Sequence, residues 1–143
     1  MTPPMKIEFI DLKAQREYIG DRMHTAILAA VNEGKYIHGP QVREFETKLA
    51  DFCGAKHAIG CANGTDALEL CLTALDLRPG EAVICPSFTF AATAEVVAGL
   101  GATPVFAEID EATFNIDPKG LEAALETAKR EGLKVKALIA VDL

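Results

Sequence analysis

The stretch Cys61-Ala62-Asn63-Gly64-Thr65-Asp66-Ala67-Leu68 decides the fold of this chain, because it leads an apolar segment through a glycine turn directly into a helix. Residues 57–62 are small and apolar enough for a buried strand, and residues 67–75 have the pattern of a helix that packs on a sheet. Gly64 suits a tight corner, and the two polar residues after it can cap the helix. A helix N-terminus presented in this way favours a phosphate group, because its amide N–H groups and its dipole attract an anion.

The same stretch also has a purely structural explanation. Asn, Gly, Thr and Asp are the residues that strand-to-helix turns prefer for capping, with or without a ligand. The glycine patterns of dinucleotide-binding and triphosphate-binding loops, G-x-G-x-x-G and G-x-x-x-x-G-K-[ST], are absent from the sequence. The stretch alone therefore leaves a phosphate site and a plain capped helix open, and it disfavours nicotinamide cofactors and nucleoside triphosphates.

The overall composition predicts a soluble globular protein of one ordinary domain. The chain has 143 residues, half of them hydrophobic, and a formal net charge of −7. No apolar run approaches the roughly 20 residues that cross a bilayer, and the start of the chain lacks the apolar core of a signal peptide, so we expect a cytoplasmic protein without a membrane span. Because the charge is acidic and the basic residues are dispersed, nucleic acid is not an expected partner.

The cysteines predict neither a metal site nor a disulfide framework. They lie among apolar neighbours without a C-x-x-C pair, a spacing that favours buried free thiols and no metal. These residues are Cys53, Cys61, Cys71 and Cys85.

Two amphipathic helices are predicted before the opening stretch. The first covers residues 13–32 and is ended by Gly34, and the second begins at Gly39-Pro40 and ends at Gly54. The apolar stripes consist of Ile19, Met23, Ala26, Ile27, Ala30 and Val31 in the first helix and of Val42, Phe45, Leu49 and Phe52 in the second.

The rest of the chain alternates strands and helices, with strands at 82–85, 104–108 and 135–141 and helices at 91–100 and 118–131. Continuous apolar strands in such an alternation predict an α/β fold whose mostly parallel sheet is covered by helices on both faces. We therefore divide the chain into an N-terminal helical segment, residues 1–55, and the first part of an α/β domain, residues 56–143.

In open parallel sheets, ligands collect at the carboxyl ends of the strands. The predicted ends carry residues 63–66, 86–93 and 108–110, and Asp142. The second end is unusual, because Phe88 and Phe90 alternate there with hydroxyl residues, and one flat ring at this place can cover a planar ligand. We expect Phe88 to pack in the core and leave Phe90 open between core packing and ligand contact.

Together these segments resemble the DegT/DnrJ/EryC1/StrS aminotransferases in order and spacing over nearly the whole chain. The matching segments are residues 10–12, 34–40, 62–68, 86–93 and 110–117. The resemblance implies the aspartate aminotransferase-like large domain (fold type I), incomplete in this chain, with pyridoxal 5'-phosphate (PLP) as cofactor. It further implies amino transfer from glutamate to a nucleotide-linked keto sugar, as in enzymes that act on UDP-linked 3-keto or 4-keto sugars for surface polysaccharides.

The resemblance also assigns roles to individual residues. Gly64, Thr65 and Asp66 would hold the cofactor phosphate, and Phe90 would lie against the pyridine face. A phosphate anchor and a stacked ring together determine the position and direction of the cofactor.

Tyr36 and His38 lie in a family segment near the active-site mouth of a homodimer. Contact with the substrate is one interpretation of these side chains, and packing in a loop between helices is the other. A homodimer is expected, because each active site of that fold borrows residues from the partner and because the apolar faces of the first two helices need cover.

No catalytic residue of the family is expected within these 143 residues. The family pattern places the Schiff-base lysine, and the aspartate that pairs with the pyridine nitrogen, after Leu143. We therefore interpret the chain as the N-terminal part of a longer enzyme, inactive by itself. Two alternatives remain open: a relative that lacks the lysine and dehydrates sugars with the same cofactor, and a non-catalytic truncated module.

Overall fold

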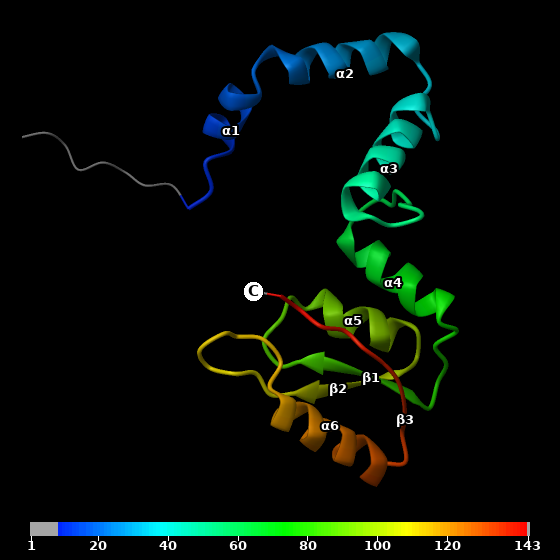
Figure 1. Cartoon of the computed structure of the whole chain (residues 1–143). Helices are drawn as coiled ribbons and strands as arrows, with labels where there is room; N and C mark the ends of the chain where they lie inside the picture. The colour runs from blue at the N-terminus through cyan, green and yellow to red at the C-terminus, as the bar shows by residue number, and fades with distance from the viewer. Residues whose placement is uncertain (1–8, 143) are drawn as a thin grey trace, which may run out of the picture. The chain divides into compact units, whose positions relative to one another are not determined.

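The chain divides into two units at the bond between Gly60 and Cys61. The computed structural model describes residues 9–142. The first unit contains α1 (Leu12–Ile19), α2 (Asp21–Glu33) and α3 (Pro40–Cys53). The second contains α4 (Gly64–Ala74), β1 (Glu81–Pro86), α5 (Ala92–Gly99), β2 (Thr103–Ala107), α6 (Pro118–Arg130) and β3 (Lys134–Leu138), as Figure 1 shows.

Glycines set the helix ends of the first unit. Gly34 and Gly54 close α2 and α3 in the left-handed conformation, and Pro40 opens α3, all as predicted. The single helix predicted over residues 13–32 is wrong, because Gly20 with φ of 67° interrupts it. At that φ a glycine is free of the strain that a side chain would bring, so the chain turns between α1 and α2.

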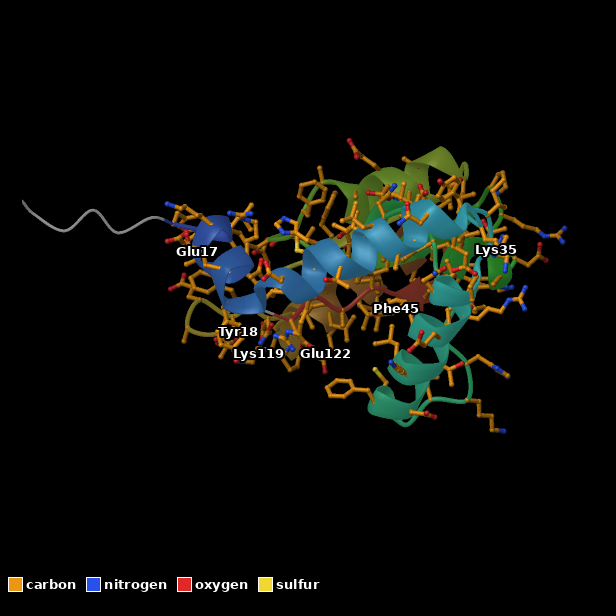
Figure 2. The ribbon with its side chains drawn as sticks, turned by 90° about the horizontal axis from the view of Figure 1, so that it is seen from above. Glu17, Tyr18, Lys35, Phe45, Lys119 and Glu122 are labelled. Atoms are coloured by element: carbon orange, nitrogen blue, oxygen red, sulfur yellow. The ribbon has the colours of Figure 1, made fainter. Side chains whose placement is uncertain are left out.

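The apolar stripes of α2 and α3 have no cover within the part of the chain that the structure describes. Val31 is 53% exposed and Phe45 is 60% exposed, although both lie on the predicted inner faces. Figure 2 labels Phe45, together with Tyr18 of α1, another exposed aromatic side chain. Among residues 9–60, only Gly39 and Ala50 are buried. These helices therefore present apolar faces that a further surface would have to cover.

Three parallel strands form the sheet of the second unit, in the order β2-β1-β3. α5 packs on one face and α6 on the other. The first core cluster contains Leu72, Leu77, Val83, Cys85, Val96, Val97 and Ala102, and the second contains Ala82, Ile84, Val105, Ala107, Ala124 and Ala128. Both faces of the central strand β1 are thus covered, and the predicted α/β fold with a parallel sheet is confirmed.

The strand predicted at residues 57–62 does not form. A strand persists when the backbone groups of a neighbouring strand pair with it, and among the described residues β2 and β3 pair only with β1. The segment is held instead by Glu46 of α3, whose carboxylate accepts the Gly60 N–H at 2.7 Å. Residues 57–62 have the apolar content of a strand, but none of the described strands pairs with them.

Burial of the thiols was predicted correctly only for Cys85. Cys53, Cys61 and Cys71 are exposed, because they lie on surfaces that no other described residues cover. Cys85 lies in β1 beneath α5, and burial raises the pKa of its thiol to about 11. None of the helices within residues 9–142 has both the length and the apolar character to cross a membrane.

Candidate functional site

The predicted ligand-binding elements of the second unit lie at one end of it. In Figure 1 the arrowheads of β1 and β2 point toward the same side as the N-terminal ends of α4 and α5. α4 packs beside α5, and α5 packs on both strands. This end therefore carries the start of α4, the segment after β1 and the loop after β2.

Asn63 caps α4. Its side-chain oxygen accepts the backbone N–H of Asp66 at 2.9 Å, and the first intrahelical bond runs from Ala67 N–H to Asn63 O. The predicted capping by Thr65 and Asp66 is wrong, because the helix begins at Gly64 and these residues form its first turn. The N–H of Asp66 is thereby engaged.

Two amide donors at this helix start remain open. The N–H groups of Gly64 and Thr65 have no acceptor among residues 9–142, and the Thr65 hydroxyl has none either. Gly64 does not occupy a tight corner as expected: its φ is not left-handed, and an added Cβ would meet no atom within 4 Å. Unpaired amides at a helix start with open space beside them match what a phosphate group needs.

Phe90 follows β1 at the same end of the unit. Its ring is 79% exposed, so packing against the described residues does not explain its place. Phe88 was expected in the core and is not there, since its side chain is 53% exposed. Its ring instead lies 5.4 Å from the ring of Phe114, centroid to centroid, with the planes tilted by 37°.

The loop after β2 delivers Phe114 to this pair. The carboxylate of Asp110 accepts the backbone N–H groups of Ala112 and Thr113 and the Thr113 hydroxyl at 2.9–3.1 Å. The bond from the Thr113 backbone is the main reason why the pKa of Asp110 lies below its ordinary value. Phe114 adopts φ of 58° at the end of this turn. Sequence reasoning missed the ring pair, although the D-x-x-T pattern signals the turn.

Tyr36 and His38 lie in the first unit, in the segment between α2 and α3. They line a hollow of about 580 Å³ formed by residues 34–40 and Arg43. The hydroxyl of Tyr36 donates to Val31 O at 2.9 Å, while the ring stays exposed. His38 has φ of 48°, a left-handed conformation within this short connection. The hydroxyl of Tyr36 is thus held by a hydrogen bond, while its ring remains accessible to a ligand.

The residues at the start of α4 and after β1 fit PLP. The unpaired amides of Gly64 and Thr65 and the Thr65 hydroxyl suit a phosphate monoester, and the exposed ring of Phe90 offers a flat apolar face. Asp66 is the third residue predicted to hold the phosphate. Its backbone N–H is bonded to Asn63 and its carboxylate stabilises the helix start, and its role at a phosphate stays a prediction.

Known proteins resemble this chain over nearly its whole length. A UDP-2-acetamido-2-deoxy-3-oxo-D-glucuronate aminotransferase of Pseudomonas aeruginosa is 51% identical over 137 residues, 96% of this chain and 36% of that protein. The crystal structure of a DegT DnrJ EryC1 StrS aminotransferase from Brucella abortus superposes with a TM-score of 0.92 at 52% identity. That match covers 96% of this chain and 37% of the other.

A third relative carries the cofactor. NtdA of Bacillus subtilis, whose crystal structure has the cofactor PMP bound, matches with a TM-score of 0.74 at 28% identity, over 91% of this chain and 35% of that one. This chain thus spans little more than a third of the length of these relatives. The sequence pattern of the DegT/DnrJ/EryC1/StrS aminotransferase family matches residues 17–143, and the chain belongs to that family.

Proposed function

We propose that the protein is a PLP-dependent aminotransferase that converts a nucleotide-linked keto sugar into an amino sugar, with glutamate as the amino donor. The observation that carries this proposal is the start of α4, where the amides of Gly64 and Thr65 have no acceptor among the described residues and open space lies beside Gly64. Membership in an aminotransferase family supports the reaction class. The exposed Phe90 at the same end of the unit supports a planar cofactor.

In this proposal the described residues bind and orient the cofactor. Gly64 and Thr65 hold the phosphate through their amides, and the Thr65 hydroxyl adds a third donor. Phe90 covers one face of the pyridine ring and sets its plane. Bound there, the cofactor supplies an electron sink for the carbon that exchanges its amino group. Residues 56–143 would then be the first part of the PLP-binding domain, after the helical segment 1–55.

Covalent attachment and proton transfer are assigned to residues outside this chain. The family pattern places the Schiff-base lysine and the aspartate that pairs with the pyridine nitrogen after Leu143. The 143 residues as a separate polypeptide would therefore show no transaminase activity.

For the substrate we propose a UDP-linked 3-keto sugar. The basis is the Pseudomonas aeruginosa relative, which is named for a UDP-linked 3-oxo sugar acid and is 51% identical over the matched residues. Tyr36 and His38, in the hollow before α3, are the candidate substrate contacts of the first unit. The product would be an amino sugar for surface polysaccharide or a related pathway, made in the cytoplasm.

A homodimer is part of the proposal. The apolar faces of α2 and α3 are uncovered by the described residues, and a second subunit would remove them from water. Sedimentation of the protein as its gene encodes it should give a dimer, and a monomer that turns over substrate would refute this part.

The function is tested with the protein as its gene encodes it. PLP is added, the absorbance spectrum is recorded, and borohydride reduction is followed by intact mass. One adduct on one lysine, ping-pong kinetics with glutamate and amination of a UDP-linked 3-keto sugar are the expected results. Bound PLP without a trapped adduct, together with sugar dehydration, would favour the dehydratase of the same family. Absence of PLP binding would favour a non-catalytic module.

A further inference from the structure

The exposed ring of Phe90 needs something other than packing to direct it. With 79% of the residue accessible, side-chain contacts place little constraint on the ring. The backbone then sets the point and direction from which the side chain leaves the chain, because the Cα–Cβ bond follows the backbone conformation, while rotation about χ1 and χ2 is left for a ligand to settle. The groups that hold the backbone around Phe90 are therefore candidates for positioning residues.

Thr93 makes both of the hydrogen bonds that bracket Phe90. Its backbone N–H donates to Phe90 O at 3.0 Å, and its hydroxyl oxygen lies 2.8 Å from the hydroxyl oxygen of Thr89. One bond holds the carbonyl that follows the Cα of Phe90, and the other holds the residue before it. The backbone of Phe90 is thus tied on both sides to a single residue of α5.

Thr93 itself is firmly held. It is 4% exposed in the first turn of α5, and the thiol of Cys85 in β1 lies 3.6 Å from its carbonyl oxygen. Because burial raises the pKa of that thiol to about 11, it stays protonated at neutral pH and can donate to the Thr93 carbonyl. The neighbouring Val96 and Val97 bury α5 in the core.

The hydroxyl of Thr93 does not perform the usual task of a threonine near a helix start. The capping residue of α5 is Ala91, which has no side-chain acceptor, and the first backbone bonds run to Phe90 O and Ala91 O. The Thr93 hydroxyl bonds to Thr89 instead, in the segment that carries Phe90. This buried polar group thus links α5 to the segment after β1.

We infer that Thr93, through its hydroxyl bond to Thr89, is a positioning residue that holds the backbone from which the Phe90 ring reaches the cofactor. The inference rests on the proposed function, since the ring needs a defined direction only when it covers a planar ligand. A purely structural role for the same bond would stabilise the start of α5 without affecting how a ligand is held.

The test compares Thr93→Val, which removes the hydroxyl at nearly constant shape, with Thr93→Ser, which retains it. Thr127→Val in α6 is the matched control, because Thr127 is a half-buried helical threonine at the far end of its helix from the site. Pyridoxamine phosphate (PMP) is the probe, since it cannot form a Schiff base and so reports non-covalent binding. The readouts are the PMP dissociation constant, the circular dichroism of the bound ring, and hydrogen exchange of residues 87–94 in the cofactor-free protein.

For Thr93→Val we expect a PMP dissociation constant raised by about 3- to 10-fold, the range for weakening one aromatic contact. The circular dichroism of bound PMP should change, and residues 87–94 should exchange faster. Thr93→Ser and Thr127→Val should match the unmodified protein within about 2-fold.

A Thr93→Val protein that is less stable but binds PMP with unchanged affinity and circular dichroism would overturn the inference. If Thr93→Val does not fold, Thr89→Val breaks the same bond from its half-buried side and is judged by the same readouts. Failure of the unmodified protein to bind either PMP or PLP would instead refute the proposed function, and the inference with it.

Discussion

Replacing Gly120 by alanine tests the packing that places the loop after β2. Gly120 lies in the first turn of α6, where its N–H donates to the side chain of the capping Asp117 at 3.0 Å. An added Cβ would lie 2.7 Å from Glu108 O, 2.8 Å from Glu108 N and 3.0 Å from Glu108 Cα. All three are backbone atoms of the residue that follows β2, so no side-chain rotation can relieve the overlap.

Two opposing effects determine how much Gly120→Ala changes the free energy of unfolding. Overpacking against backbone costs about 1–3 kcal/mol, whereas alanine in place of glycine within a helix contributes up to about 1 kcal/mol of stability. The steric cost should win, because contacts below 3.0 Å force α6 and β2 apart. We expect a net loss of about 1–2 kcal/mol in the free energy of unfolding.

Urea unfolding of the protein, followed by circular dichroism, measures this difference. Gly99→Ala in α5 is the matched control, because an added Cβ there meets no atom within 4 Å. That control should be neutral or slightly stabilising. If Gly120→Ala is as stable as the control, α6 does not approach the Glu108 backbone this closely, and their packing does not position the loop after β2.

Three further predictions concern the candidate site. Phe90→Leu should change the free energy of unfolding by less than about 0.5 kcal/mol, because Phe90 is 79% exposed. The same substitution should weaken PMP binding about 3- to 10-fold in a fluorescence or absorbance titration. An unchanged affinity would show that Phe90 does not contact the cofactor. Asn63→Ala should lower thermal stability by the equivalent of about 1 kcal/mol through loss of the α4 cap, and an unchanged melting temperature would show that the cap contributes nothing. The pKa of Asp110 is lowered in the folded protein, so its stabilising contribution is full above the unfolded value of 3.8 and is lost as the pH falls through the folded pKa. The stability gap between the unmodified protein and Asp110→Asn should therefore close at acidic pH, and a gap independent of pH between 6 and about 2 would contradict this cause.

Local signals were sufficient for most of the secondary structure. Gly34, Gly54 and Pro40 mark helix ends through the conformations that these residues alone prefer, and the structure has the ends at those places. The strands β1 and β2 were found from continuous apolar runs, which buried parallel strands require. Such features depend on residues that are neighbours in the sequence, so they can be predicted before the fold is known.

Features that depend on distant partners were not predictable in this way. Residues 57–62 have the apolar content of a strand, but a strand also needs a pairing neighbour, and none of the described strands pairs with them. Cys71 is exposed because no described residues cover the side of α4 that carries it. The spacing of apolar residues in the sequence does not show which side of a helix is covered. The contact of Phe88 with Phe114 requires the left-handed turn at Phe114, which places a ring from one loop against a ring from another.

The residues of the candidate site were proposed from the sequence, whereas their geometry comes from the structure. Gly64, Thr65, Asp66 and Phe90 were assigned to the cofactor from a family resemblance, and their roles as cofactor ligands stay predictions. The structure adds that Asn63 is the cap, which leaves the amides of Gly64 and Thr65 for a ligand. The observed cap lies two positions before Thr65, a small shift in sequence, but it determines which donors remain open.

A crystal structure of the protein with bound PMP tests the central claim most directly. We expect phosphate oxygens within about 2.7–3.2 Å of the amide nitrogens of Gly64 and Thr65, with the Phe90 ring stacked on the pyridine. A phosphate bound elsewhere, with these two amides still solvated, would refute the proposed cofactor site.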